Sequence, residues 1–492
     1  RQLNVHLEQV ITIYERIIHA QKPIYYTNTV DVANSIADPE PLVEAPGNLI
    51  RSLDDTSPAL AAEISNVSLA RGLRAFEHFL ERATAAPELV RTLETDSTLS
   101  RHLLDMFEHS PYFAEEFIRE PDLIVEAQEV VSRKLPFPDY TASAHRILEP
   151  AGLRRFFRRE MVRIQTDSIC AKAAIFDTLG RTSDLADAVI AAAYRMAVKH
   201  VAGAKPPAEA GYQPSDQLMV IAMGRLGMRE FDLASDADLV FVLPDDDQRE
   251  MQFWTRVAER TIELLSAYTG EGTLFAVDTR LRPNGREGDL VQTVGAYKEY
   301  YSRVAEAWEG MACMKSRAVV GNMEAATEFL HQLQEVDWRR YGQSGRSRTD
   351  LRHMRLRLEK EQGLGNPLKA GRGGYYDIDF ALMYLRLKGA GLFFKVLNTP
   401  ERIDILEKMG HLEREDAAFL EDAATFYRAL DHALRVFSGH AEGSLPNSES
   451  KLAALDELVE RWIPGRLHDE TLSVKVAQIR QKTRQVFDRL FG

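Results

Sequence analysis

The sequence predicts an α+β fold that is mostly α-helical, with a small mixed sheet flanked by helical bundles. Two patterns indicate this fold. Apolar residues recur at helical spacing along most of the 492-residue chain, whereas short apolar runs typical of strands cluster between residues 216 and 281. In addition, 45% hydrophobic and 27% charged residues are typical of a globular protein, and the length exceeds what one core usually serves. We therefore expect several domains.

The first predicted domain, residues 1–135, is a helical N-terminal region. Its clearest helix is RGLRAFEHFLERA, in which Leu73, Phe76, Phe79 and Leu80 fall on one face and charged residues flank them. Prolines interrupt the helical pattern at intervals, which predicts several short helices rather than one long one.

The second predicted domain, residues 136–335, is the catalytic candidate, and the third, residues 336–492, is a C-terminal helical bundle. Two long amphipathic helices lead into the catalytic domain, LRRFFRREMVRI (153–164) and SDLADAVIAAAYRMAV (183–198). Three strands follow: DQLMVIAM (216–223), DADLVFVL (236–243) and GTLFAVDTRL (272–281). After residue 320 the pattern is helical again, apart from the glycine-rich turn KAGRGG (369–374).

Composition excludes several classes of function. The net charge of −13 argues against binding to a nucleic-acid backbone, although it allows a local basic pocket. No apolar stretch reaches the ~20 residues of a membrane span. The two cysteines suggest neither a disulfide framework nor a metal site, so we expect a cytoplasmic protein. Because the chain begins with Arg1 rather than Met, we expect it to be a piece of a longer protein.

Two carboxylates stand at the start of the second predicted strand. Side chains alternate along a strand, so Asp236 and Asp238 point to one face and Ala237 to the other. Like charges roughly 6–7 Å apart repel each other unless a cation lies between them. Mg²⁺ prefers such oxygen ligands. Asp278 on the third predicted strand could complete a site for two ions that binds the attacking and leaving oxygens at phosphorus.

The residues around these aspartates fit a phosphate ligand. Gly224 ends a strand and opens a turn whose amides can approach a phosphate, and Ser235 offers a hydroxyl. Candidate counter-charges for a triphosphate are Arg225, Arg229, Arg280 and Arg282. Lys315 and Arg317 either face the nucleotide or are solvated charges at a helix-to-strand junction.

An isolated Asp-x-Asp is usually a solvated turn, but here it forms part of a larger arrangement. A glycine turn, Ser-Asp-x-Asp-Leu-x-Phe and a third strand with a central aspartate follow one another. In this order they resemble the nucleotidyltransferase superfamily, which includes polymerase beta. The resemblance implies a polymerase-beta-like core, with Asp236, Asp238 and Asp278 as catalytic metal ligands.

Longer segments resemble one family, the bacterial glutamine synthetase adenylyltransferases. The segments are LRRFFRREMVRI, SDLADA, GRLGMREFDLASDADLVF, VDTRLRPNGREGDLV, AWEGMACMKSRAVVG, KAGRGGYYDIDF and FYRALDHALRV, and they span roughly residues 70–440. The resemblance implies transfer of AMP from ATP to a tyrosine of glutamine synthetase with Mg²⁺, a role in nitrogen metabolism, and regulation by PII signalling protein and glutamine. It implies no membrane or nucleic-acid partner.

The family carries two such domains in one multifunctional chain, one adenylylating and one removing the adenylyl group. VDTRLRP and DIDF are closer to the adenylylating, C-terminal half, and Arg1–Ile18 resembles the helix that ends the first half. The removing half remains an alternative, as does a non-catalytic module that binds PII or glutamine. The chain departs from the family pattern at Met228, where glycine is usual, and at Asp379, where glutamate is usual.

Overall fold

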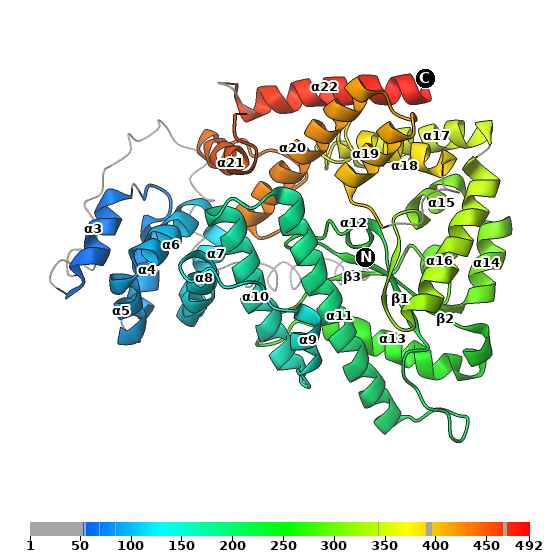
Figure 1. The fold of residues 1–492 in the computed structure, drawn as a ribbon, viewed down its shortest axis with the longest axis horizontal. Helices are drawn as coiled ribbons and strands as arrows, with labels where there is room; N and C mark the ends of the chain where they lie inside the picture. The colour runs from blue at the N-terminus through cyan, green and yellow to red at the C-terminus, as the bar shows by residue number, and fades with distance from the viewer. Residues whose placement is uncertain are drawn as a thin grey trace, which may run out of the picture. The chain divides into compact units, whose positions relative to one another are not determined.

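The computed structural model describes residues 53, 56–67, 69–83, 85–342, 344–389, 396–465 and 470–492 (Figure 1). The predicted helix Arg1–Ile18 lies outside the described residues. The described residues belong to one compact unit, within which the domain boundaries at residues 135 and 335 remain predictions. None of the described helices combines the length and the apolar character needed to cross a membrane.

Helices dominate the described chain, as the sequence predicts. The N-terminal region contains α3 (Pro58–Asn66), α4 (Leu73–Ala83), α5 (Pro87–Thr95), α6 (Ser97–His109), α7 (Pro111–Arg119) and α8 (Ile124–Val131). The middle region contains α9 (Tyr140–His145), α10 (Pro150–Cys170), α11 (Ile175–Ala204), α12 (Gly224–Gly227), α13 (Met251–Ser266), α14 (Val294–Arg303), α15 (Ala307–Cys313) and α16 (Met323–Asp337). The C-terminal region contains α17 (Gly345–Gln362), α18 (Tyr375–Lys388), α19 (Thr399–Lys408), α20 (Arg414–Ser438), α21 (Glu449–Trp462) and α22 (Leu472–Phe491).

Local signals explain the short N-terminal helices. The Asp96 carboxylate accepts a hydrogen bond from the Leu99 amide at 2.9 Å and so caps the start of α6. The apolar face predicted for α4 is buried, because the Phe76 ring lies edge-on to Phe107 of α6 with 5.2 Å between centroids. The aromatic face and the capping residue together fix this part of the helical array.

A five-stranded mixed sheet lies at the centre of the middle region. Its strands are β1 (Met219–Ala222), β2 (Ala237–Leu243), β3 (Val277–Asp278), β4 (Val291–Thr293) and β5 (Arg317–Val320). The strand order is β3-β2-β1-β5, and β4 also pairs with β2. β1 runs antiparallel to β2 and β5, whereas β3 and β4 run parallel to β2. The predicted α+β fold with a mixed sheet is therefore confirmed.

Helices cover both faces of this sheet. Met219 and Ile221 of β1 pack in one apolar cluster with Tyr297 of α14 and Phe329 of α16. The alternate residues of the same strands belong to the other cluster, which includes residues of α11 and α13. Figure 1 shows α14 and α16 on one side of the strands and α11 and α13 on the other. Asp238 shares its strand face with Val240 and Val242, so it lies on the α14 and α16 side.

The third predicted strand, 272–281, is wrong in its extent. Only Val277–Asp278 pairs with β2. The amides of Leu274 and Phe275 instead donate to the carbonyl of Leu265 near the end of α13, at 3.3 Å each. Backbone amides that donate to a carbonyl at the end of a helix cannot also form hydrogen bonds with a neighbouring strand, so the strand is short. The sequence analysis also missed β4, which has three residues.

Glu160 on α10 links stability of this helical layer to pH. Burial raises the pKa of Glu160 to about 7, Glu126 and Glu129 add to the shift, and Arg163 opposes it. A folded-state pKa above the ordinary value of 4.5 means that stability falls as pH rises between these values. We expect Glu160→Gln to stabilise the protein by ~1–3 kcal/mol at pH 8 and much less at pH 5, as measured by thermal unfolding. The exposed control Glu259→Gln should leave the stability unchanged at both pH values. If the stability of Glu160→Gln varied with pH as that of the wild type does, the prediction would be contradicted.

Candidate active site

The turn after β1 packs directly against one of the aspartates. Gly224 has a φ of +56°, and a Cβ added there would lie 2.2 Å from Oδ2 of Asp238. The amide of Met223, one residue earlier, donates to the carbonyl of Asp238 at 2.8 Å. Glycine is therefore required at position 224 both for its backbone conformation and for the close approach of the carboxylate.

The sheet places two of the predicted aspartates side by side. Asp238 and Asp278 are direct partners in the parallel β2–β3 register. Burial raises the pKa of Asp238 to about 6, and the charges of Asp278 and Asp236 add to the shift. Asp236 lies just before β2 and is exposed. Two carboxylates held together in this way, one with a raised pKa, are typical of a site built for a cation or for chemistry.

Arg280 supplies the positive charge that faces this pair. Its Nε donates to both carboxylate oxygens of Asp278, at 2.9 and 2.7 Å, and its backbone amide donates to Oδ1 at 2.8 Å. Burial alone would raise the pKa of Asp278, but these hydrogen bonds hold it below the usual value. The Arg280 side chain is 60% exposed, so it can leave without opening a cavity in the core.

The carboxylates are chemically suited to bind a divalent cation, although their oxygen atoms do not point to one common position. As the side chains stand, no group of three His, Cys, Asp or Glu residues in the described part of the chain could hold a metal. Two observations nevertheless favour a cation here: the adjacent carboxylates Asp238 and Asp278, and the nearby hydroxyl of Ser235. This hydroxyl is buried and has no hydrogen-bond partner among the described residues.

Two lysines, Lys315 and Lys369, lie close enough to Asp238 to affect its pKa. Lys315 Nζ donates to Oδ2 of Asp379 on α18 at 2.6 Å. Lys315 and Lys369, the latter from the glycine-rich turn, both act to lower the pKa of Asp238. The departure from the family pattern at Asp379 therefore lies at the edge of the site, where the shorter carboxylate holds Lys315.

Several predicted arginines are directed elsewhere. The guanidinium of Arg282 donates to Gly288, Thr279 and Arg286 within its own loop. Arg317 forms a two-pronged ion pair with Asp187 of α11, at 2.6 and 2.7 Å. Arg229 pairs with Asp184 of the same helix. Because these guanidinium groups are occupied by protein acceptors, they stabilise the loops around the site.

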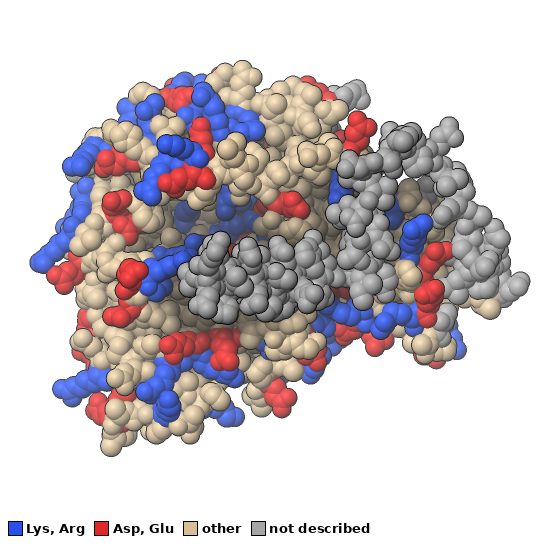
Figure 2. Space-filling model, turned by 180° about the vertical axis from the view of Figure 1, so that it is seen from behind, with Lys and Arg blue, Asp and Glu red and all other residues tan. Residues whose placement is uncertain are grey.

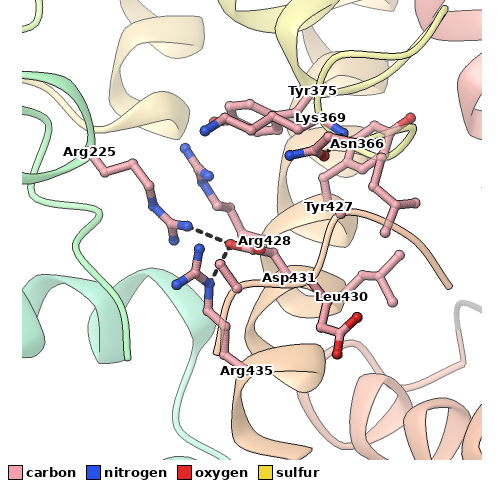
Figure 3. A pocket seen from close by; sticks show the side chains of 13 residues that line it. Arg225, Asn366, Lys369, Tyr375, Tyr427, Arg428, Leu430, Asp431 and Arg435 are labelled. Atoms are coloured by element: carbon pink, nitrogen blue, oxygen red, sulfur yellow. Dashed lines mark hydrogen bonds and ion pairs between the residues drawn. The ribbon is translucent and has the colours of Figure 1, made fainter. Parts of the chain in front are cut away.

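Arg225 lines a cavity of about 100 Å³ and points toward Asp431 (Figure 3). Its guanidinium and that of Arg435 converge on the carboxylate of Asp431, as the dashed lines show. Tyr375 and Lys369 line the same cavity.

Figure 2 shows the side of the molecule opposite to Figure 1, with a hollow in which Lys and Arg side chains gather beside acidic ones. Such surroundings suit an anionic ligand.

Buried side chains of α20 hold the loop between β1 and β2, which the sequence does not predict. His432 Nδ1 donates to the Asp232 carboxylate at 2.8 Å, Arg428 donates to Glu230, and Arg435 Nη1 donates to the carbonyl of Leu233 at 2.7 Å. All three α20 side chains are buried, so they are not surface residues of the helix. The available signal was a polar stripe at helical spacing: Arg428, Asp431, His432 and Arg435.

Two family models match parts of this chain. Residues 100–332 match the family model described as GlnE, glutamate-ammonia ligase adenylyltransferase. Residues 343–491 match the model described as GlnD PII-uridylyltransferase.

Curated relatives carry one name, bifunctional glutamine synthetase adenylyltransferase/adenylyl-removing enzyme. The protein of Mycobacterium bovis is 35% identical over 293 residues, which cover 58% of this chain and 27% of the relative. The protein of Hahella chejuensis is 29% identical over 383 residues, which cover 73% of this chain and 40% of the relative. The protein of Streptomyces coelicolor is 30% identical over 390 residues, which cover 76% of this chain and 38% of the relative. The chain thus spans less than half the length of these relatives. Through its matched core, residues 100–332, the chain is similar to the glutamate–ammonia ligase adenylyltransferase family.

Proposed function

We propose that the chain is a nucleotidyltransferase that transfers AMP from ATP to a tyrosine hydroxyl of glutamine synthetase. The observation that carries the proposal is the pairing of Asp238 with Asp278 in register, against the Gly224 turn. The names of the relatives supply the substrate. In this reaction the phenolic oxygen bonds to the α-phosphorus, the bond from the α-phosphorus to the bridging oxygen breaks, and pyrophosphate leaves with the electron pair.

The chain's own residues prepare this reaction. Asp236, Asp238 and Asp278 would hold divalent cations, Mg²⁺ by their oxygen chemistry and two by the resemblance, and such ions neutralise phosphate charge and acidify a bound hydroxyl. The turn at Gly224 lets backbone amides approach the phosphates, with Ser235 beside them. Lys315, near Asp238, and Arg280 supply positive charge to the leaving pyrophosphate. Asp278 positions the attacking hydroxyl or accepts its proton.

The remaining nucleotide-binding predictions take a modified form. Arg225 contributes through the cationic cavity that it lines with Lys369, and Arg282 contributes by fixing the loop that carries Arg280. The match of residues 343–491 to a PII-uridylyltransferase model supports regulation by PII protein, and we propose PII and glutamine as effectors.

Removal of the adenylyl group is the second candidate, because the relatives' printed name includes both activities. Incubation with Mg²⁺, unmodified glutamine synthetase and ATP labelled at the α-phosphate tests the proposal. We expect label on the synthetase and release of pyrophosphate. If instead only adenylylated synthetase reacts, losing its label as ADP in the presence of phosphate, the removing activity is the correct one. No reaction in either direction would leave the non-catalytic module as the function.

The Gly224 turn provides a sharp test of the site. In Gly224→Ala, the new Cβ would collide with the Asp238 carboxylate and displace it. We expect AMP transfer to fall by ~10–100-fold, because reacting groups tolerate little misplacement. Gly211→Ala is the matched control, since Gly211 also has a positive φ, +86°, but has nothing within 4 Å of an added Cβ. Equal activities of the two variants in the labelling assay would show that the contact with Asp238 has no role.

A further inference from the structure

A second cavity, of about 440 Å³, is lined by Asp236 and is separate from the cavity that Lys369 lines. One wall consists of residues 231–236 and 272–276, which lead directly into β2 and β3. Because these two strands are parallel, both segments enter the sheet from the same end. The cavity therefore lies at the end of the sheet where both strands begin, and Asp236 lines it.

Aromatic rings form the apolar part of this cavity. Phe275 stands edge-on to Phe157 of α10, with 5.7 Å between centroids, and to Phe231, with 5.3 Å. Phe231 and Phe275 are buried, whereas Phe157 is half-buried. The rings leave this space empty, and its volume lies within the range of small-ligand pockets, ~300–1,000 Å³.

Polar groups without a protein partner mark the end of the cavity nearest β2. Ser235 is only 5% exposed, yet its hydroxyl has no hydrogen-bond partner among the described residues. A buried hydroxyl left without a partner is costly, and a ligand that hydrogen-bonds to it would remove the cost. Two charged residues that line the cavity are already paired, Glu116 with Arg119 and Arg158 with Glu120.

We propose that this cavity binds the acceptor, a tyrosine side chain presented by the protein substrate. The inference rests on the proposed function and names the part of the site that recognises the acceptor. A phenol has an apolar ring and one polar end, which matches aromatic walls followed by Ser235 and Asp236. An adenine base presents polar atoms along two edges and would leave several of them facing the rings. The ring thus packs against Phe157, and the hydroxyl lies toward Asp236.

Phe157→Ala tests the proposal in the full chain. The KM for glutamine synthetase should rise at least ~10-fold, because an apolar anchor is lost, while the KM for ATP stays within twofold. Phe156→Ala is the matched control: Phe156 is the neighbouring half-buried ring on α10, but it lines a different cavity. A rise in the KM for ATP, or equal effects of both variants, overturns the proposal. If Phe157→Ala does not fold, Phe157→Leu carries the same test.

Direct binding separates failure of the cavity from failure of the proposed function. Saturation-transfer NMR with N-acetyl-tyrosinamide should give ring signals with wild type and Phe156→Ala, and none with Phe157→Ala. N-acetyl-phenylalaninamide, which cannot reach Ser235 with a hydroxyl, should give weaker signals. Inactive wild-type protein that still shows this pattern contradicts only the proposed function. Absence of ring signals with wild-type protein contradicts the cavity assignment.

Discussion

Replacing Asp236 and Asp238 together by asparagine should abolish AMP transfer and leave the fold as stable as before, or more stable. The two carboxylates are the proposed ligands of the catalytic cations, and the amide cannot replace their charge. We expect the rate to fall by ~10³-fold or more in the labelling assay, as when electrostatic stabilisation of a transition state is lost.

The stability result distinguishes catalytic carboxylates from structural ones. Asp238 faces Asp278 in register, so in the absence of a cation its charge is unfavourable. Asparagine removes this repulsion, and we expect up to ~1 kcal/mol of stabilisation in urea unfolding. An aspartate that only supported the fold would instead destabilise the protein when replaced. Such a trade-off between stability and activity is common at functional sites.

The control is Asp246→Asn, an exposed aspartate just beyond the other end of β2. It should keep transfer within twofold of wild type. Transfer that survives in the double variant would exclude both carboxylates from the chemistry, whatever the stability. Loss of transfer together with loss of the fold would assign the two aspartates to the structure rather than to the reaction.

Local patterns made β2 and its aspartates predictable. The alternation of side chains in DADLVFVL and the glycine that opens the turn are both patterns of a few neighbouring residues. In the structure, Gly224 lies against Asp238. The long helices α10 and α11 were equally accessible, because each repeats its apolar period over several turns. Strand β3 was overestimated, since its neighbours found acceptors on α13 that no local pattern reveals.

Partners of charged residues were the least predictable part of the site. Arg225 lies within the recognised turn, yet its guanidinium binds Asp431, from a segment distant in sequence. Any of the chain's 61 basic residues could pair with any of its 74 acidic residues on composition alone, so only the folded chain selects the pair. The polar stripe of α20 shows which helix face binds a buried charge, but not which loop provides that charge.

The largest effect on stability is expected from Arg428→Ala, which breaks the link between α20 and the loop that precedes β2. Glu230 is fully buried and accepts hydrogen bonds from Arg428 Nε at 2.8 Å and from the Thr399 amide at 2.6 Å. The Arg428 guanidinium also lies 3.9 Å from the centre of the Tyr375 ring. Removing the guanidinium leaves a buried charge without its main partner, which costs ~3–5 kcal/mol.

Urea unfolding of Arg428→Ala measures this cost, and two further variants identify its source. Arg303→Ala removes an exposed ion pair with Glu299, 2.8 Å long, and should cost less than ~0.5 kcal/mol. Glu230→Gln combined with Arg428→Ala should recover part of the loss, because the neutral amide is cheaper to bury than the carboxylate. If the second substitution adds to the loss instead, the penalty does not arise from the orphaned charge.

The pH dependence of the Arg428→Ala penalty provides the strictest check, because its sign is fixed by the mechanism. In the wild type, burial would raise the pKa of Glu230, but Arg428 and Thr399 hold it below the model-compound value of 4.5. Without Arg428, we expect burial to outweigh Thr399 and Arg402, which also lower this pKa, and to raise the folded-state pKa above 4.5. The folded variant then binds a proton more readily than the unfolded chain. Stability of the variant therefore falls as pH rises through the window between the two pKa values. We expect the penalty to be smaller at pH 5 than at pH 8, and a penalty that does not change with pH would assign the loss to packing against Tyr375 rather than to the buried charge of Glu230.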